Sequence, residues 1–561
     1  MELTGLPEIP TTLAALAVGG SRHGDFPAFR HRGADGLGGD WHEVSYLESD
    51  ELIQRTGAGL IAMGVKPGEC IALFADSSTA WTVVDMAIFA AGAATVPIFS
   101  TSTAGEVDWV LRDSGARIVF VDNAAAAETV ESLNLGVTVI GLYPALVEKS
   151  LADVAVDGAD AGHRAELLVR ARAVTPEDVA SIVYTSGTTS KSKGCILTHG
   201  NLRGVYAGLL AYKMLVPGET AAVFLPQAHL FARVVVLGCY AYGCTVSYVS
   251  KDPARMLADL GEIKPQYIPA VPRIFEKLYS AIHANPNLTQ EERQTMARAM
   301  TGGRVRQFSA GGAPIDLKIL EFFHAAGVPV LEGFGLTEGG GVVSNSATDA
   351  YKLGTVGRAL PGFQIKISEE GELLVGGVGV FKGYKNNPQA TAIALRDGWL
   401  HTGDLASIDE DGYLRIIGRI KDLIITSGGK NIAPTPIEQE LARHPLVSQA
   451  ILVGDRRAYC TALFTLSEPA MEHYADHEAE IASVVETVNV TLPGYSKIHN
   501  WQILPEELSV AAGTLTSTQK LRRAAVLERY DAMVGAMYQD ERRPLLVLQG
   551  SLNQGGAEAA S

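Results

Sequence analysis

The sequence predicts an α/β protein with a large N-terminal domain of helix-covered sheets, including a small β-rich subdomain, followed by a small α+β C-terminal domain. Three patterns support this prediction. In the first half, β-rich segments such as CIALFAD, TVPIF and RIVFVD alternate with segments of helical apolar spacing such as AWTVVDMAIFAAGA. From about residue 362, short strands separated by glycine turns leave no room for crossover helices. After residue 420, PTPIEQELARHP predicts a helix, and QAILVGD and CTALFTL predict paired strands.

These changes of pattern also divide the chain into domains. We expect an N-terminal domain at residues 1–420, with the β-rich subdomain at about 362–420, and a C-terminal domain at 421–540. Residues 541–561 are small, polar and rich in glycine, which predicts a flexible tail. The alternation of strands and helices in the first domain predicts parallel sheets with helices on their faces.

The composition limits the classes of partner and compartment. The net charge is −16, from 62 acidic and 46 basic residues, which argues against nucleic acid as the main partner. A polyanionic substrate therefore has to meet a local cluster of cations. The five scattered cysteines show no metal-ligand spacing and favour a reduced cytoplasmic compartment. With no apolar run of about 20 residues, we expect contact with a membrane surface only to collect an apolar substrate.

The segment TSGTTSKSKG at residues 185–194 holds no apolar side chain. It lies between VASIVY and GCILTHGNL, which both resemble strands, so we expect it to join strand to strand. A Walker-type loop requires a following helix and the order Gly-Lys-Ser/Thr, whereas here the order is Ser192-Lys193-Gly194. Hydroxyls, glycines and two lysines suit a phosphate-binding turn, because backbone N–H groups in such turns bind anions. A solvated hairpin fits this segment equally well.

Four further segments help to decide whether the loop at 185–194 is a phosphate-binding turn or a solvated hairpin. They are EGFGLTE at residues 332–338, HTGD at 401–404, GRIKD at 418–422, and LTSTQKLRR, which contains Lys520. Each alone is ambiguous, because Asp404 can simply begin a turn and a single lysine is usually on the surface. In this order, the five segments resemble those of the adenylate-forming enzymes: acyl-CoA synthetases, firefly luciferases and the adenylation domains of peptide synthetases. The resemblance covers about residues 12–530, and GRIKDLIITSGGKNIAP and PQAHLFAR are most similar to bacterial long-chain fatty-acid–CoA ligases.

The resemblance implies a two-step reaction. A carboxylate attacks the α-phosphorus of ATP to give acyl-AMP and pyrophosphate, and the thiol of CoA then displaces AMP. It implies ATP, Mg²⁺ and CoA as cofactor and co-substrates, and small molecules as partners. It also implies a C-terminal domain that moves between the two half-reactions.

By resemblance, the loop at 185–194 binds the β- and γ-phosphates of ATP. The residues implied are Thr185, Ser186, Gly187, Thr188, Thr189 and Lys193. The sequence departs from the family pattern in having Ser190 and Ser192 where Gly and Pro are usual, which restricts positive φ and loosens the loop. We expect Lys191 to face solvent.

The resemblance also implies the residues around the nucleotide. Glu338 is expected to bind Mg²⁺, Thr337 to contact the α-phosphate, and Lys520 to contact both the substrate carboxylate and the α-phosphate. Asp404 is expected to accept from the ribose hydroxyls, with Arg419 as a second ribose or phosphate contact. The expected adenine slot consists of Gly311, Gly312 and Ala313 on one side and Glu332, Gly333, Phe334 and Gly335 on the other. Without the resemblance, the segment SAGGAP would be read as an ordinary Gly-Pro turn.

The remaining implied residues concern the acyl chain and CoA. Lys421 is expected to be the hinge, and Ser427, Gly428, Gly429 and Lys430 to line the tunnel for pantetheine. His229 is expected to gate the acyl pocket, although a histidine among apolar residues is usually part of the core. The run from Gly339 to Val342 has little side-chain volume, which suits an acyl tunnel or close packing of helices.

The sequence leaves several functions open. The leading hypothesis is a long-chain fatty-acid–CoA ligase. The alternatives are ligation of a medium-chain, branched, aryl or specialised-metabolite acid, transfer of the acyl group to a carrier protein, and a catalytically weak binding scaffold. ATP–pyrophosphate exchange separates the last from the others, whereas chain length, the natural acid and the oligomeric state cannot be read from the sequence.

Overall fold

The computed structural model describes residues 10–33, 39–185, 191–285, 287–509, 511–515 and 521–539. The predicted tail at 541–561 lies outside the described residues. The chain divides into two compact units, one of residues 1–402 and 406–416 and the other of residues 403–405 and 417–561. None of the described helices combines the length and the apolar character needed to span a bilayer.

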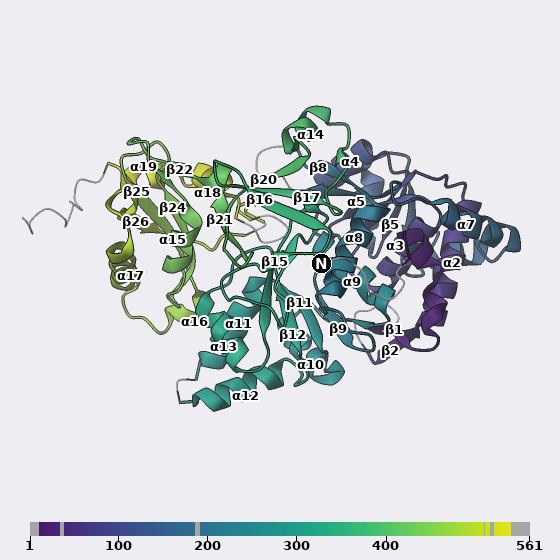
Figure 1. The fold of residues 1–561 in the computed structure, drawn as a ribbon, viewed down its shortest axis with the longest axis horizontal. Helices are drawn as coiled ribbons and strands as arrows, with labels where there is room; N and C mark the ends of the chain where they lie inside the picture. Colours follow the sequence, from purple (N-terminus) through teal and green to yellow (C-terminus); the bar gives the residue numbers. More distant parts are fainter. Residues whose placement is uncertain are drawn as a thin grey trace, which may run out of the picture. The chain divides into compact units, whose positions relative to one another are not determined.

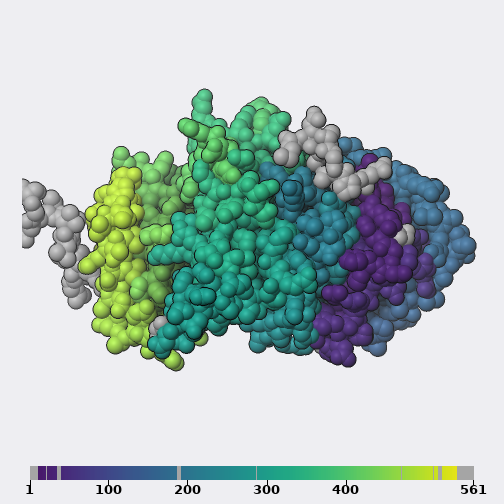
Figure 2. Space-filling model, turned by 60° about the horizontal axis from the view of Figure 1, so that its bottom comes forward, coloured from purple at the N-terminus to yellow at the C-terminus, as the bar shows by residue number. Residues whose placement is uncertain are grey.

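A seven-stranded sheet of the first unit has the order β18-β8-β7-β4-β3-β5-β6. Figure 1 labels two of its strands, β8 and β5. Its strands are β3 (Cys70–Phe74), β4 (Ala94–Ile98), β5 (Ile118–Val121), β6 (Thr138–Gly141), β7 (Val179–Thr185), β8 (Lys193–Thr198) and β18 (Gly383–Tyr384). The strands from β3 to β7 are parallel, whereas β8 is antiparallel to both β7 and β18. The accompanying helices are α1 (Leu13–Ala17), α2 (Tyr46–Ala62), α3 (Thr79–Ala90), α4 (Ala104–Ser114), α5 (Ala124–Ser132), α6 (Leu151–Asp157), α7 (Ala161–Ala173) and α8 (His199–Ala211). Helix α2 packs against α6 and α7, so purple and blue surfaces adjoin in Figure 2.

A nine-stranded sheet has the order β15-β14-β13-β12-β11-β9-β10-β1-β2. Its strands are β1 (Pro27–Arg32), β2 (Trp41–Ser45), β9 (Thr220–Val223), β10 (Thr245–Tyr248), β11 (Tyr267–Ala270), β12 (Gln307–Ala310), β13 (Val330–Phe334), β14 (Ser344–Asn345) and β15 (Arg358–Ala359). The helices between them are α9 (Leu230–Tyr242), α10 (Pro253–Ile263), α11 (Pro272–His283), α12 (Gln290–Met300) and α13 (Leu317–Ala325). The 3-10 helix η1 (Gly20–His23) precedes this sheet, and η2 (Thr337–Gly339) follows β13.

The β-rich segment forms a five-stranded sheet of β16 (Phe363–Ile367), β17 (Glu372–Gly377), β19 (Leu395–Arg396), β20 (Trp399–Ile408) and β21 (Leu414–Arg419). It also contains the short helix α14 (Pro388–Ala394), which the sequence pattern did not predict. Asn387 caps this helix by accepting from the backbone N–H of Ala390, and Pro388 occupies its first turn.

The second unit combines two small sheets with helices. Its strands are β22 (Ile424–Ile425), β23 (Asn431–Ile432), β24 (Val447–Val453), β25 (Cys460–Leu466) and β26 (Ile498–Ile503). Its helices are η3 (Ile420–Asp422), α15 (Pro434–Leu441), α16 (Glu468–Met471), α17 (His477–Thr491), η4 (Gly494–Ser496), α18 (Arg523–Arg529) and α19 (Asp531–Met537). Strands β24 and β25 pair, as predicted, and their pairing is antiparallel, whereas β26 pairs parallel to β25. The predicted α/β fold class is thus confirmed.

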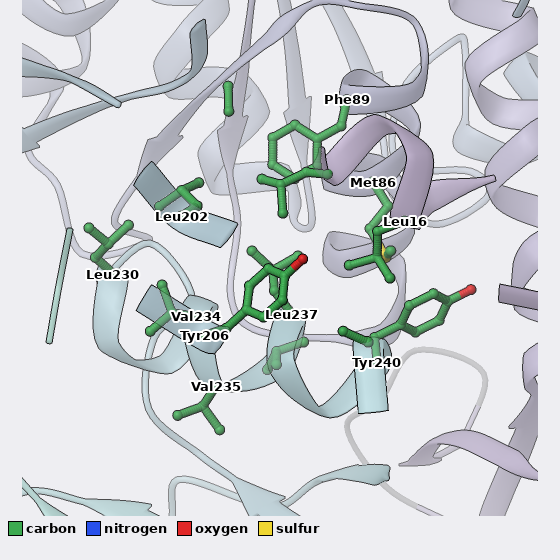
Figure 3. Packing of buried hydrophobic residues seen from close by; sticks show 14 of the residues in the cluster. Leu16, Met86, Phe89, Leu202, Tyr206, Leu230, Val234, Val235, Leu237 and Tyr240 are labelled. Carbon is green, nitrogen blue, oxygen red and sulfur yellow. The ribbon is translucent and has the colours of Figure 1, made fainter. Parts of the chain in front are cut away.

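The main core of the first unit lies where α3, α8 and α9 pack together. Figure 3 shows Met86 and Phe89 from α3, Tyr206 from α8, and Val234 and Leu237 from α9 in this cluster. All five side chains are fully or almost fully buried. An apolar cluster of this kind supplies most of the stability of a domain of this size.

One buried ion pair lies inside this core. Arg233 of α9 and Asp85 of α3 are each 1% exposed, and the Arg233 Nε donates to the Asp85 Oδ2 at 2.8 Å. The Arg233 Nη1 also donates to the Ser181 hydroxyl at 2.7 Å. The Thr95 hydroxyl donates to the Asp85 Oδ1 at 2.7 Å, and the Ser181 hydroxyl donates to the Thr95 carbonyl oxygen at 2.7 Å. The network therefore joins two helices to β4 and β7.

Because this pair is desolvated, removal of one partner leaves a buried charge without compensation. We predict that Arg233→Met lowers the free energy of unfolding of the first unit by about 3–5 kcal/mol. The double change Asp85→Leu/Arg233→Met is expected to cost less than Arg233→Met alone. Urea denaturation measures both. Arg112→Met, which removes an exposed ion pair with Asp108 on α4, is the matched control and is expected to change stability by about 0.5 kcal/mol or less. Equal losses for Arg112→Met and Arg233→Met would contradict this role.

Candidate functional site

The polar loop joins two antiparallel strands. Strand β7 ends at Thr185 and β8 begins at Lys193, and these two residues are register partners. The prediction of a strand-to-strand loop is confirmed. Four of the residues implied in phosphate binding, Ser186, Gly187, Thr188 and Thr189, lie outside the described residues. Thr185 and the arm from Lys191 to Lys193 are described.

Trp109 of α4 contacts this arm. Its indole Nε1 donates to the Ser192 carbonyl oxygen at 2.8 Å. The Lys191 ammonium lies 4.5 Å from the centroid of the same ring, at a distance typical of a cation–π contact. Lys191 is exposed, as expected, but its ammonium lies against an aromatic face. One side chain thus holds two consecutive residues of the arm.

A second group of contacts brings Lys193 and Glu338 together. The Tyr384 hydroxyl donates to the Glu338 Oε1 at 2.6 Å, and the Lys193 ammonium lies 4.6 Å from the centroid of the Tyr384 ring. The Phe381 backbone N–H donates to the Glu338 carbonyl oxygen at 2.9 Å. Burial and the Glu338 carboxylate together raise the pKa of Tyr384, so the phenol keeps its proton and remains a donor.

Glu338 also fits the requirements of a magnesium ligand. Mg²⁺ is usually bound by one or two carboxylates, with substrate phosphates and waters completing its coordination. Within the described ranges, no group of three or more His, Cys, Asp or Glu side chains is arranged to hold a metal ion. A single carboxylate beside a lysine suits an ion that is held largely by phosphate oxygens.

The two segments of the expected adenine slot lie side by side. Strands β12 and β13 are parallel, with Ala310 and Glu332 as register partners. A Cβ on Gly311 would lie 3.5 Å from the Gly333 carbonyl oxygen, and one on Gly333 would lie 2.2 Å from the Asn345 Oδ1. Larger residues at 333 would therefore displace β14. The residues of both sides lie at the ends of these two strands: Gly311, Gly312 and Ala313 on one side, and Glu332, Gly333, Phe334 and Gly335 on the other.

Glu332 is buried at the base of this region. Its Oε1 accepts from the Ile315 backbone N–H at 3.4 Å. Burial raises the pKa of Glu332 to about 7, while backbone donors at Ile315 and Gly354 and the charge of Arg415 act in the opposite direction. Sequence reasoning placed Glu332 in the slot but gave no indication of this shift.

The residues expected around the acyl chain lie at the start of α9 and in and just after η2. His229 caps this helix, and its Nδ1 accepts from the Phe231 backbone N–H at 3.3 Å. Gly339 and Val342 are buried. A Cβ on Gly341 would lie 3.1 Å from the Leu230 Cβ. Gly341 thus packs closely against α9, and a Cβ on Gly340 would lie 2.8 Å from Val205 of α8, so close packing, one of the two interpretations left open, holds for these two glycines.

Thr337 begins η2, directly before Glu338. The remaining candidate residues belong to the second unit. Asp404 on β20 is buried, and its Oδ1 accepts from the Arg419 Nε at 3.1 Å. Lys421 lies in η3 and is exposed. Ser427, Gly428, Gly429 and Lys430 form the turn between β22 and β23, in which Gly429 has a φ of 72°. Lys520 lies outside the described residues.

Trp109 and Tyr384 were not singled out from the sequence. Trp109 is 83 positions from Ser192, and Tyr384 is 46 positions from Glu338, so no local spacing connects them. Arg233, the last residue of the segment PQAHLFAR, was not predicted to have a partner. A usable signal existed for it, because Arg233 and Asp85 are the single charges in two otherwise apolar helices.

Comparisons with known proteins identify the family of the chain. The family model described as AMP-binding enzyme matches residues 17–385, and the model of the AMP-binding enzyme C-terminal domain matches residues 421–542. Similar curated proteins include the long-chain-fatty-acid–CoA ligase FadD15 of Mycobacterium bovis, which is 35% identical over 90% of this chain and 94% of its own. The long-chain-fatty-acid–CoA ligase ACSBG2 of Xenopus laevis is 26% identical over 93% of this chain and 83% of its own.

The fold is also found in a solved structure with bound nucleotide. The crystal structure of ATP-bound MatB from Rhodopseudomonas palustris matches with a TM-score of 0.76 and 26% identity, covering 93% of this chain and 99% of its own. The family model alone spans more than half of the sequence, and the strand-to-strand loop and the Glu338 segment both fall within it. The chain therefore belongs to the family of AMP-binding enzymes.

Proposed function

We propose that this protein is an ATP- and Mg²⁺-dependent long-chain fatty-acid–CoA ligase, which forms an acyl-AMP and then transfers the acyl group to CoA. The observation that carries the proposal is the convergence of Lys193 and Glu338 on Tyr384, at the end of the polar loop. The similarity to ligases named for long-chain fatty acids over about nine-tenths of the chain supports the substrate class.

In the first half-reaction, one anion attacks another, so positioning and charge neutralisation matter more than acid–base catalysis. In this proposal, Thr185, the loop hydroxyls and Lys193 bind the β- and γ-phosphates. Glu338 holds Mg²⁺, which supplies charge neutralisation to the phosphate oxygens when bound. Thr337 contacts the α-phosphate, and Lys520 stabilises charge on the α-phosphate and the attacking carboxylate.

The second half-reaction requires another set of residues to face the acyl-AMP. We propose that the second unit rotates about Lys421, because a few boundary residues commonly absorb such a change of backbone angles. Ser427, Gly428, Gly429 and Lys430 then line the path of pantetheine, and His229, Gly339 and Val342 border the acyl chain. Asp404 and Arg419 hold the ribose. The Arg419–Asp404 hydrogen bond supports their action as a pair.

The substrate class is tested by measuring CoA-dependent AMP formation with straight-chain acids of graded length and with aryl acids. We expect the highest kcat/KM for long-chain fatty acids. Lys520→Ala serves as the inactive reference in the same assay. It is expected to lower acyl-adenylate formation about 10²–10³-fold, the typical loss of a preorganised charge-stabilising donor. A preference for short or aryl acids would overturn the substrate class, and near wild-type pyrophosphate release by Lys520→Ala would overturn the role of that lysine.

The contact of Trp109 with the arm predicts an effect on ATP. Trp109→Phe removes the N–H donor to Ser192 but keeps an aromatic ring beside Lys191. We expect the KM for ATP to rise about 2–10-fold, corresponding to the loss of one neutral hydrogen bond. Adding Ser192→Pro to this variant is expected to lower the KM again, because proline restricts the backbone of the arm.

Trp41→Phe is the matched control for this experiment. The Trp41 Nε1 donates to the Glu262 Oε2 at 2.8 Å, far along the sequence from the loop. We expect no change in the KM for ATP. An equal rise for Trp41→Phe and Trp109→Phe would show that the effect is not local to the arm.

The raised pKa of Glu332 predicts a dependence of stability on pH. The native carboxyl holds its proton up to about pH 7, whereas the ordinary value is 4.5, so the native state loses relative stability as the pH rises from 5 to 8. Glu332→Gln removes this loss. Between pH 5 and 8, we expect the free energy of unfolding of the variant to rise by about 2–4 kcal/mol relative to that of the wild type, as measured by urea denaturation. Exposed Glu321→Gln on α13 is the control and is expected to follow the wild type; parallel curves for all three proteins would contradict the assignment.

A further inference from the structure

Tyr384 lies on β18, which pairs with β8, the strand that begins with Lys193. Strand β18 pairs antiparallel with β8, with Tyr384 opposite Cys195. The Lys385 backbone N–H donates to the Gly194 carbonyl oxygen at 2.8 Å, and the Tyr384 backbone N–H donates to the Thr391 hydroxyl at 2.9 Å. The main chain around Tyr384 is therefore bound on both sides and does not depend on its side chain.

The Tyr384 side chain contacts two candidate phosphate-site residues through different atoms. Its hydroxyl donates to the Glu338 Oε1 at 2.6 Å, whereas the face of its ring lies beneath the Lys193 ammonium at 4.6 Å. Phe381 packs its ring edge-on against Tyr384, with centroids 4.8 Å apart and an interplanar angle of 72°. This aromatic contact limits rotation of the phenol and thereby fixes the positions of its hydroxyl and of its ring face.

These contacts have a consequence for substrate binding. Lysine and glutamate have long side chains that lose considerable rotational freedom when they are ordered. A group that already holds both side chains removes part of that loss from the binding step, which is the usual effect of preorganisation. The hydrogen bond to a carboxylate is charge-assisted and therefore of the stronger kind, and the cation–π contact adds a weaker attraction.

We propose that Tyr384 is a positioning residue that sets the Glu338 carboxylate and the Lys193 ammonium in a fixed relation for binding of the metal–triphosphate. The proposal rests on the proposed function of this site in ATP binding, and not on which acid is activated. In this proposal, the Tyr384 hydroxyl positions the Glu338 carboxylate and the Tyr384 ring positions the Lys193 ammonium. The two contributions can therefore be removed separately.

Two variants make this separation. Tyr384→Phe removes the hydroxyl and keeps the ring, whereas Tyr384→Leu removes both. ATP affinity is measured by titration calorimetry without any acid, once in the absence of Mg²⁺ and once over a series of Mg²⁺ concentrations. Tyr212→Phe is the matched control, because its hydroxyl donates to the Ala359 carbonyl oxygen at 2.7 Å away from Lys193 and Glu338.

For Tyr384→Phe, we expect the half-saturating Mg²⁺ concentration to rise about 3–10-fold, with metal-free ATP affinity unchanged, because one charge-assisted hydrogen bond is lost on the Glu338 side. For Tyr384→Leu, we expect the same rise and, in addition, a loss of about 2–5-fold in metal-free ATP affinity through Lys193. Tyr212→Phe is expected to match the wild type in both measurements.

The proposal is overturned if both Tyr384 variants match the wild type in ATP and Mg²⁺ binding. It is also overturned if they lower only the melting temperature, which is what a purely structural contact would do. A wild-type protein that binds ATP but activates no fatty acid would refute the proposed substrate class and leave the assignment of Tyr384 intact. A wild-type protein that binds no ATP would refute both.

Discussion

The ion pair between Arg233 and Asp85 is the constraint on which the arrangement of the first unit depends. Two charges in a core of apolar helices are tolerated only when each is paired and hydrogen-bonded. Asp85 accepts from Arg233 and Thr95, and Arg233 also donates to Ser181. These bonds form only when α3, α9, β4 and β7 are in one arrangement. An alternative packing of these elements would leave a buried charge without its partner, which costs about 3–5 kcal/mol.

The site takes its positions from elements that this network fixes. Ser181 lies on β7, the strand that leads directly into the polar loop, and Arg233 lies one helical turn after His229 at the start of α9. Strand β8 returns from the loop with Lys193 and carries β18 on its other edge. Tyr384 of β18 then meets Glu338, which follows the β13 strand of the other large sheet. The two sheets thus contribute opposite charges to one small region.

Sequence patterns predicted the regular elements because apolar periodicity and capping are local properties. Thr198, a residue type that favours helix N-termini, forms a capping box with Asn201 at the start of α8. Helix α14 was missed because its seven residues bury no side chain fully, so they show no apolar stripe. The strand before the polar loop and the strand after it were both predicted correctly.

The contacts within the site were not predictable in the same way. The pairing of Tyr384 with Glu338 and of Trp109 with Ser192 depends on tertiary structure, and a tyrosine or tryptophan in a half-buried position has many possible partners. The buried pair was closer to being predictable. A single aspartate in TAWTVVDMAIFA and a single arginine in LFARVVVLGCYAY each need a partner of opposite charge inside the core.

Amide hydrogen exchange tests most directly whether the buried pair holds these elements together. In an Asp85→Asn variant, the account predicts faster exchange in α3, in β7 and in α9 together, with β24 and β25 of the second unit unchanged, because all three elements share one network. Faster exchange confined to α3, with β7 and α9 still protected as in the wild type, would contradict it.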